Sequence, residues 1–367
     1  MNILIFEEVL KLKKILTILM VFTLAFALAA CGGGGTTPPP PPPANGGGDA
    51  ADPIDDGQVF HITAAHSHVE ALSVHNFFVF FQEEIERLGG GRITMDLFSG
   101  GVLGGDADLT TAVLAGDVTM MGANINPHSM FMPDLAVFDI QFIHNNLDQA
   151  RGVLNDPELM ARVRGIYEDY GLHLLGFTDS SFRYITANFP IRTPQDMAGL
   201  TLRASANVFH VANWEAIGAN PTPLPIGEVY VALQQGTVDA QDNPIEHNLL
   251  FLFYEQQTHF METNHLFHVN TFVMNPDFYN GLPADLQAAV DEAAANALRR
   301  TQERHDSELQ GNLDYLAGQG IILETFTPAD LEPFRALVSA GAWPVVEDAV
   351  SAETYRIFME AVERSRN

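Results

Sequence analysis

Lysine is almost absent from this acidic chain of 367 residues, and the absence restricts its function. All three lysines lie within residues 11–14, and the formal net charge is −28 at pH 7. No nucleic-acid partner is expected, because phosphate binding requires clusters of lysine and arginine. The lysine-free composition reflects either a genomic bias or a surface adapted to high salt, where screening weakens the repulsion between carboxylates.

Cysteine occurs once, at Cys31, so a disulfide bond within the chain is excluded. Lys11-Leu-Lys-Lys14 is positively charged, and the apolar run 15–28 that follows is too short for an ordinary transmembrane helix but typical of a signal peptide. The run ends in Leu28-Ala-Ala-Cys31, which resembles the lipobox of bacterial lipoproteins. We expect 1–30 to be a lipoprotein signal peptide and Cys31 to carry lipid that attaches the chain to a membrane. The alternative is ordinary signal cleavage beside an incidental cysteine.

Motifs for catalysis and cofactor binding are also missing. The glycine-rich segment Ser99–Gly105 lacks the GxGxxG fingerprint and the lysine of a P-loop, and the chain has no GxSxG or HExxH sequence. We therefore expect no cofactor and no enzymatic activity. His66-Ser-His68 suggests a metal, so an anchored extracytoplasmic metal-dependent hydrolase is an alternative. Otherwise we expect His66 to line a polar pocket and His68 to lie at an exposed helix start.

The composition changes at residue 58. Residues 31–57 contain six consecutive prolines, 38–43, between glycine-rich segments, and form the expected anchor and linker because such a sequence cannot pack a core. Beyond them, short apolar runs alternate with helical patterns, which predicts an α/β fold with mainly parallel sheets. The expected strands are 59–63, 92–98, 117–121 and 172–177, and the expected helices are 69–87, 106–115 and 147–170.

Other helix signals lie further along the chain. A helical pattern from Pro283 to about Ala317 is either one long helix or two helices with a break near Gly311. Thr193 and Thr327 are each followed by proline and, three residues on, by aspartate, which is the pattern of a helix N-cap.

Polar residues at strand ends are candidates for a ligand site, because open α/β sheets bind ligands beyond the carboxyl ends of their strands. An arginine there binds either an anionic ligand or an acidic side chain of the protein. A guanidinium suits a carboxylate because it donates two parallel hydrogen bonds in one plane. The candidates are His66, His68, Asn124, Asp179, Arg183, Arg203 and Asn243.

Four segments carry a more specific signal. They are Gly199-Leu-Thr-Leu-Arg203, Gly218-Ala-Asn-Pro-Thr-Pro-Leu-Pro225, Gly227-Glu-Val-Tyr-Val-Ala-Leu-Gln-Gln-Gly236 and Val238-Asp-Ala-Gln-Asp-Asn-Pro244. In this order and spacing they resemble the DctP family, the extracytoplasmic solute-binding proteins of TRAP transporters, and the likeness extends over roughly 59–347.

This resemblance implies a two-lobed, periplasmic-binding-protein-like (Venus flytrap) α/β fold with a long helix spanning both lobes. Lobe I is expected to comprise 58–181 and 269–308, and lobe II 182–268 and 309–367. The resemblance also implies that a small organic acid binds in the cleft between the lobes, outside the cytoplasm, and passes to small and large TRAP membrane subunits. A receptor that signals to a kinase is the alternative within the same class.

Individual residues follow from the same resemblance. The arginine with which the family binds a carboxylate corresponds to Arg203, a second family arginine to Arg183, and the asparagine of the DGQENP motif to Asn243. His66 and Asn124, on the turns after the first and third strands, are expected to face the cleft from the other lobe.

The chain also departs from the family pattern. Ala240 and Asp242 replace the glycine and glutamate of DGQENP, Ile226 stands where an aromatic residue is usual, and Gln141 precedes Phe142 in place of the usual proline. We expect Ile226, together with Glu246 just past the motif, to contact the ligand and to influence the size and polarity that the site accepts.

Overall fold

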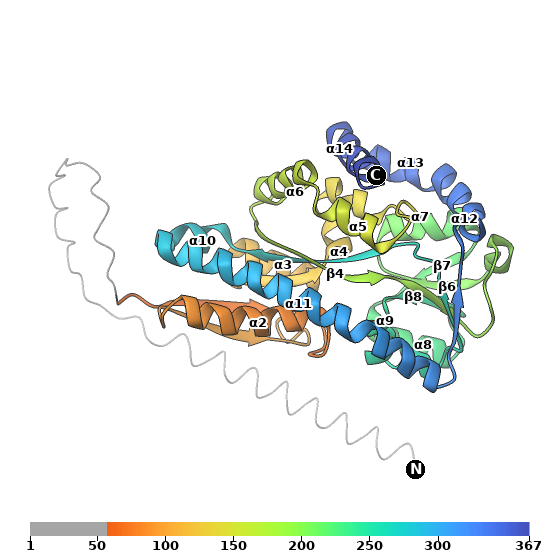
Figure 1. Cartoon of the computed structure of the whole chain (residues 1–367), viewed down its shortest axis with the longest axis horizontal. Coiled ribbons are helices and arrows are strands. Elements are labelled where there is room, and N and C mark those ends of the chain that lie inside the picture. Colours follow the sequence, from red (N-terminus) through yellow and green to blue (C-terminus); the bar gives the residue numbers. More distant parts are fainter. Residues whose placement is uncertain (1–56, 367) are drawn as a thin grey trace, which may run out of the picture. The chain divides into compact units, whose positions relative to one another are not determined.

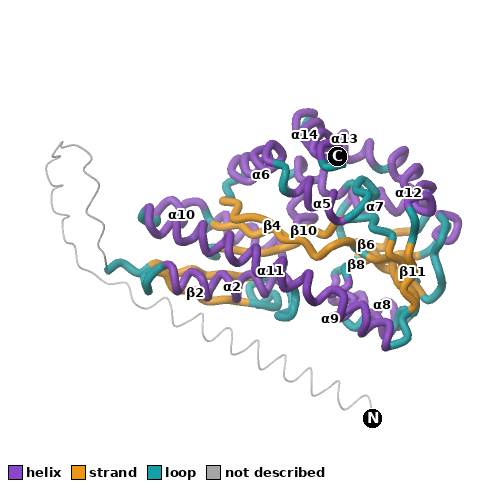
Figure 2. The backbone as a smooth tube through the Cα atoms, viewed as in Figure 1, coloured by secondary structure: helices purple, strands orange, loops and turns teal. Residues whose placement is uncertain are grey.

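Two β-sheets organise residues 57–366, the part of the chain that this computed structural model describes (Figures 1 and 2). The signal peptide, Cys31 and the proline-rich linker lie outside the described residues. The five-stranded sheet has the order β2-β1-β3-β10-β4, and the six-stranded sheet has the order β11-β9-β5-β8-β6-β7. The strands are β1 (Phe60–Ala65), β2 (Ile93–Phe98), β3 (Met120–Asn124), β4 (His173–Phe182), β5 (Tyr184–Ala187), β6 (Thr201–Ala204), β7 (Asn220–Pro223), β8 (Ala240–Asn243), β9 (His259–Glu262), β10 (Phe267–Met274) and β11 (Ile322–Thr325).

Each sheet is mainly parallel and contains one reversed strand. In the first sheet β10 runs antiparallel to both of its neighbours, β3 and β4. In the second, β5 runs antiparallel to β8 and β9. The two reversed strands lie where the chain passes between the sheets, since β5 follows directly on β4 and β10 returns from β9. The predicted two-lobed α/β fold is confirmed.

Helices cover both sheets, and several short 3₁₀ turns accompany them. The helices are α2 (Ser73–Leu88), α3 (Asp106–Ala115), α4 (Ile125–Ser129), α5 (Leu147–Leu154), α6 (Pro157–Asp169), α7 (Val208–Ile217), α8 (Val229–Gln234), α9 (Ile245–Leu250), α10 (Pro276–Gly281), α11 (Ala284–Gly318), α12 (Pro328–Gly341), α13 (Trp343–Ala349) and α14 (Ala352–Arg364). The 3₁₀ turns are η1 (Pro133–Asp139), η2 (Pro194–Met197), η3 (Ile226–Glu228) and η4 (Phe253–Glu255).

Helix α11 is one continuous helix of 35 residues, so the alternative of a break near Gly311 is wrong. Its first half packs with α2 on the five-stranded sheet, where Val290 and Ala293 are buried. Its second half places Leu316 against Tyr184 of the six-stranded sheet. Figure 1 shows α11 running from beside α10 to α9 and α8, so the predicted helix spanning both lobes is confirmed.

Several predicted elements have different bounds in the structure. The helix expected over 147–170 is two helices, because Asp156 accepts hydrogen bonds from the first backbone amides of α6 and Pro157 cannot continue a hydrogen-bonded ladder. Thr193 does start a helical turn, but η2 ends after four residues. Helix α2 begins at Ser73 rather than residue 69, so His68 lies in the loop before it, partly buried.

The C-terminal segment contributes to both lobes. Strand β11 joins the six-stranded sheet, and α12 packs Phe334 and Val338 beside Trp214. Helices α13 and α14 instead join the core around η1, α5 and α6, where Phe358 and Ala361 are buried. Lobe II was expected to contain all of 309–367, whereas the apolar face of α14 returns the last helix to lobe I.

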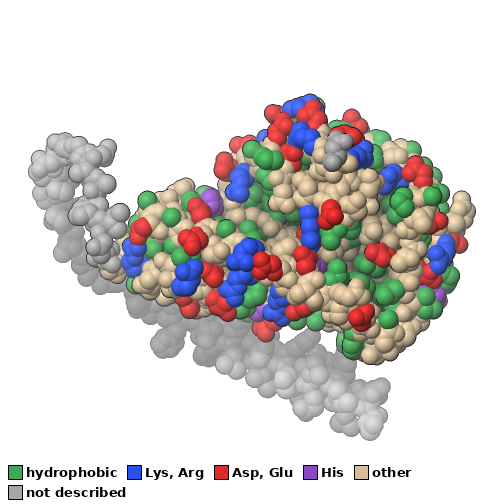
Figure 3. All heavy atoms as spheres, in the orientation of Figure 1, with side chains coloured by type: hydrophobic (Ala, Val, Ile, Leu, Met, Phe, Trp, Pro, Cys, Tyr) green, Lys and Arg blue, Asp and Glu red, His purple; other side chains and the backbone are tan. Residues whose placement is uncertain are grey.

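Most helical arginines pair with nearby acids at the surface. On α11, Arg299 contacts Glu303 and Arg304 contacts Glu308, each one turn away. Figure 3 shows basic and acidic side chains side by side along this face. Such exposed pairs contribute little to stability, typically below about 1 kcal/mol.

Candidate ligand-binding site

Arg203 is a buried cation without an acidic partner among the described residues. It lies on β6, and only 4% of its surface is exposed. Its Nε and Nη2 both donate to the carbonyl oxygen of Leu224, at 3.0 and 2.7 Å, while no carboxylate lies within ion-pair distance in the described chain. Burial and the neighbouring charge of Arg183 lower the pKa of Arg203 to about 10, so the side chain stays charged at neutral pH. The more distant Asp242 charge offsets these effects only in part. Burying a charge without a direct ion pair is costly, and an anion supplied from outside would compensate it.

Arg183, between β4 and β5, is equally buried but already neutralised. Its Nε donates to Oδ2 of Asp242 at 2.5 Å, and its Nη2 donates to the carbonyl oxygen of Asp242 and to Oδ1 of Asn243 at 2.5 and 3.2 Å. Burial would raise the pKa of Asp242, but the Arg183 charge and a hydrogen bond from His265 hold it well below its ordinary value. The two strand-end arginines therefore differ, because Arg183 belongs to an internal ion pair whereas Arg203 has no ion-pair partner within residues 57–366.

The two predicted asparagines end their strands beside these charges. Asn243 ends β8, accepts from Arg183 and donates to Oε1 of Gln241 at 2.6 Å. Asn124 ends β3, and its Oδ1 caps α4 by accepting from the amide of Asn126 at 2.9 Å. Its Nδ2 lies 2.9 Å from Nε2 of His268 and donates to a backbone carbonyl oxygen at 3.1 Å. The structure thus brings Asn124 and Asn243 together around the His268–Arg183 contact.

Most of the other polar side chains considered for the site are histidines. His66, after β1, is fully buried, stacks on Phe78 and contacts Nδ1 of His75 through Nε2 at 3.0 Å. Burial, followed by the nearby His68 and His75, lowers the pKa of His66 to about 3. His68 does not lie exposed at a helix start, since its Nδ1 is buried and its ring lies 6.3 Å, between centroids, from that of His247.

Sequence reasoning missed His247 and His268. His247 is on α9, one turn past the Asp-Asn-Pro segment, and His268 is the second residue of β10. Their ring centroids are 5.1 Å apart, and Arg183 Nη1 contacts Nδ1 of His268 at 3.0 Å. Burial is the main reason that the pKa of His247 falls to about 3 and that of His268 falls well below its ordinary value. The missed signal at His268 was a histidine inside a mainly apolar strand, which also contains Asn270 and Thr271.

Glu246 is held by protein groups from three other elements. Its Oε2 accepts from Ser73 Oγ at 2.7 Å, its Oε1 accepts from Ser180 Oγ at 2.5 Å, and His305 of α11 lies 3.7 Å away. Burial would raise the pKa of Glu246, but His305 and these hydrogen bonds lower it to about 2. A ligand that contacted Glu246 would have to compete with these protein groups, because the carboxylate already joins α9 to α2, β4 and α11.

Ile226 opens η3 and is half-buried, packing with Val229 and Phe253. An aliphatic side chain here fills a small apolar cluster without presenting an aromatic face. Asp179, another strand-end candidate, pairs with Arg151 at 2.8 Å and belongs to an ion pair on the other side of β4.

A contact between the lobes that the sequence did not reveal lies next to Arg203. Asn207 caps α7 on lobe II, and its Nδ2 donates to the carbonyl oxygen of Asn126 at 3.0 Å and to Ser129 Oγ at 3.1 Å, both on α4 of lobe I. The loop that follows β6 is thus tied to the opposite lobe. This interlobe contact is four residues from Arg203 along the chain.

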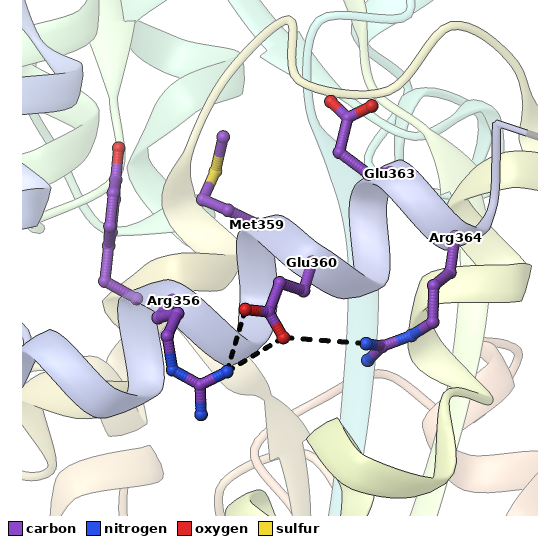
Figure 4. Close-up of a pocket in the computed structure, with 6 residues that line it drawn as sticks. Arg356, Met359, Glu360, Glu363 and Arg364 are labelled. Carbon is purple, nitrogen blue, oxygen red and sulfur yellow. Dashed lines mark hydrogen bonds and ion pairs between the residues drawn. The ribbon is translucent and has the colours of Figure 1, made fainter.

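Other features of the described residues do not compete with this site. Residues 57–366 contain no group of three or more His, Cys, Asp or Glu side chains arranged to hold a metal ion, so His66 and His68 lack further ligands. A separate hollow of about 630 Å³ beside α14 is lined by groups that neutralise one another, since Arg356 contacts Glu360 at 2.8 Å and Arg364 approaches it at 3.7 Å (Figure 4). None of the helices in residues 57–366 combines the length and hydrophobicity needed to cross a lipid bilayer.

Comparison with known proteins gives consistent matches. The chain is 29% identical over 283 residues to a solute-binding protein of Verminephrobacter eiseniae, covering 76% of this chain and 82% of that protein. The structure of a TRAP periplasmic solute-binding protein from Ochrobactrum anthropi is 27% identical, with a TM-score of 0.77 over 84% of this chain and 96% of that one. A TRAP protein from Shewanella oneidensis with bound succinate is 25% identical, with a TM-score of 0.77 over 83% and 100% of the two chains.

The family comparison covers most of the globular part. The model of DctP, described as bacterial extracellular solute-binding protein, family 7, matches residues 64–342, which include all of both sheets except the start of β1, and every site residue discussed above. On this match and the agreement in fold, the chain belongs to the DctP family of bacterial extracellular solute-binding proteins.

Proposed function

We propose that this protein is the extracytoplasmic receptor of a TRAP transporter, that it captures a small organic acid between its lobes, and that Arg203 binds the carboxylate. The observation that carries the proposal is the charge of Arg203, which is buried and has no acidic partner in the described chain. Relatives of similar fold hold organic acids, including succinate in the Shewanella oneidensis protein. The acid is then delivered to small and large TRAP membrane subunits.

The surrounding groups have supporting roles in this proposal. The Arg183–Asp242 ion pair fixes Asn243 and His268 without adding net charge. Asn243, Asn124 and His66 offer polar contacts from both lobes, and Ile226 adds an apolar one. The Asn207 contact joins the two lobes close in sequence to Arg203. Closure of the lobes on a carboxylate would exclude water and strengthen its ionic hydrogen bonds.

Isothermal titration calorimetry with a panel of monocarboxylates, dicarboxylates and sugar acids tests the proposal. Arg203→Ala should weaken binding of any acid that binds by about 3–5 kcal/mol, because it leaves a desolvated carboxylate unpaired. Arg299→Ala is the matched control, since it removes an exposed arginine of α11 and should leave affinity unchanged. Equal affinity of wild type and Arg203→Ala, or no binding by any carboxylate, would contradict the proposal.

We also propose that lipid on Cys31 anchors the receptor on the extracytoplasmic side of a membrane and that 1–30 is removed as a lipoprotein signal peptide. The lipobox-like sequence Leu28-Ala-Ala-Cys31 and the linker composition support this. In a bacterial host the full-length protein should fractionate with membranes, and Cys31→Ser should remain outside the lipidated fraction. Mass spectrometry of the mature N-terminus distinguishes lipidation from ordinary cleavage.

A further inference from the structure

Two neighbouring histidines, His68 and His247, have rings without hydrogen-bond partners among residues 57–366. His68 comes from the loop after β1 in lobe I and His247 from α9 in lobe II, and their rings lie edge to face at 6.3 Å. Nδ1 of each ring is buried without a partner, and neither ring forms a hydrogen bond with another described residue. Most buried polar side-chain atoms in folded proteins are paired, so two such rings side by side are candidates for contact with a ligand.

Their position relative to the charges restricts that ligand. The ring of His247 lies 5.1 Å, between centroids, from that of His268, which contacts Nη1 of Arg183 at 3.0 Å. His68 and His268 flank it on either side. Arg183 in turn donates to Asn243 of β8, and β8 pairs with β6, the strand that carries Arg203. The two rings therefore lie by the same group of strand ends as Arg203, and a molecule held by Arg203 can extend toward them.

Two charged groups of this region make a second carboxylate unfavourable. The charge of Arg183 is already compensated by Asp242. Oε1 of Glu246 lies 3.9 Å from Nδ1 of His247, so an added anion there would meet a buried carboxylate. A neutral imidazole provides one donor and one acceptor, which matches a hydroxyl group.

We propose that His68 and His247 form a hydroxyl-recognition subsite, and that the ligand is a polyhydroxylated monocarboxylate, with one carboxylate on Arg203 and hydroxyl groups on the two imidazoles. This inference rests on the proposed function and narrows its substrate class. Because the two rings come from opposite lobes, the hydroxylated end of the ligand contributes to holding the lobes together.

Calorimetry with acids of equal carbon-chain length tests the proposal directly. The better of D-gluconate and D-galactonate should bind at least about 100-fold more tightly than hexanoate, which lacks hydroxyls, and adipate, which carries a second carboxylate. This is about tenfold for each imidazole, and a tenfold change equals about 1.4 kcal/mol. Hexanoate or adipate binding as tightly as the sugar acids would overturn the proposal.

Substitutions of His68 and His247 test whether these two rings cause the preference for hydroxylated acids. His68→Phe and His247→Phe should each weaken sugar-acid binding about tenfold and leave hexanoate binding unchanged, while His247→Gln, which keeps a donor and an acceptor, should retain part of the affinity. His61→Phe is the control, since His61 lies at the surface on β1 beside Asp96. Equal losses for the sugar acid and hexanoate in the phenylalanine variants would show a role in shape only and overturn the proposal.

The two levels of inference fail in different ways. If hexanoate or adipate binds best and Arg203→Ala abolishes that binding, the carboxylate receptor stands and the hydroxyl subsite falls. If no carboxylate binds the wild-type protein, both fall. Melting temperatures of the ligand-free variants confirm that each is folded before its affinity is compared.

Discussion

Replacement of Glu246 by glutamine should destabilise the ligand-free protein, because this carboxylate links α9 of lobe II to lobe I. The charged form accepts hydrogen bonds from Ser73 and Ser180 and lies 3.7 Å from His305. Burial raises its pKa and these partners lower it, with a net shift from 4.5 to about 2. At about 1.4 kcal/mol per pKa unit, the charged form contributes roughly 3 kcal/mol of folding free energy.

Urea unfolding at pH 6 measures this loss for Glu246→Gln, and thermal unfolding should show a decrease of roughly 6 °C in melting temperature. Glu303→Gln is the matched control, since its partner Arg299 is exposed on the same face of α11 and such pairs contribute well under about 1 kcal/mol. Unchanged stability of Glu246→Gln would refute the link between the lobes that the contacts indicate.

The pH dependence gives an independent check. Because the folded-state pKa of Glu246 is lowered, its contribution is present above about pH 4.5 and is lost as the pH falls toward 2. Burial lowers the pKa of His305, but Glu246 raises it to a net value above 6.5, so this contribution is present below pH 6.5 and is lost as the pH rises through the folded-state pKa. The stability difference between wild type and Glu246→Gln should therefore be largest between about pH 4.5 and 6.5.

Two further substitutions test the surroundings of the cleft. Asp242→Asn should cost about 3–5 kcal/mol in urea unfolding, because it leaves Arg183 buried without a counterion, and a smaller loss than that of Glu303→Gln would contradict the assignment. Gly122→Ala should cost about 1–3 kcal/mol, since its Cβ would lie 2.9 Å from the ring of Phe272, whereas Gly165→Ala, in open space on α6, should be neutral or stabilising. Equal melting temperatures for the two alanine variants would show that the strand has room at Gly122.

Much of the architecture could be predicted because local patterns decide it. Helix α3 coincides with the predicted 106–115, and the Thr327–Asp330 capping box forms as expected. The predicted helix bounds are wrong where the same local sequence pattern is compatible with two different structures. The capping pattern at Thr193 starts only a 3₁₀ turn, and the helical pattern over 147–170 hides a second cap at Asp156.

The site likewise has a part that the sequence predicts and a part that it does not. Sequence motifs identified Arg203 and Arg183 together as strand-end arginines, since both positions follow from strand and turn patterns within a short segment. They could not separate a free arginine from a paired one, because the partner of Arg183 is Asp242, brought beside it only by the pairing of β5 with β8. The burial of these two arginines could not be predicted either, because it depends on how the lobes pack and not on composition.

Family, two-lobed fold and the strand-end arginines can all be read from the order of residues along the chain, because they depend on motifs and on periodicities within single elements. The free charge of Arg203, the unpaired rings of His68 and His247, and the position of Glu246 between the lobes depend on residues far apart in sequence. Hydrogen bonding and desolvation act through space, so only the folded chain determines which polar groups are satisfied and which are left for a ligand.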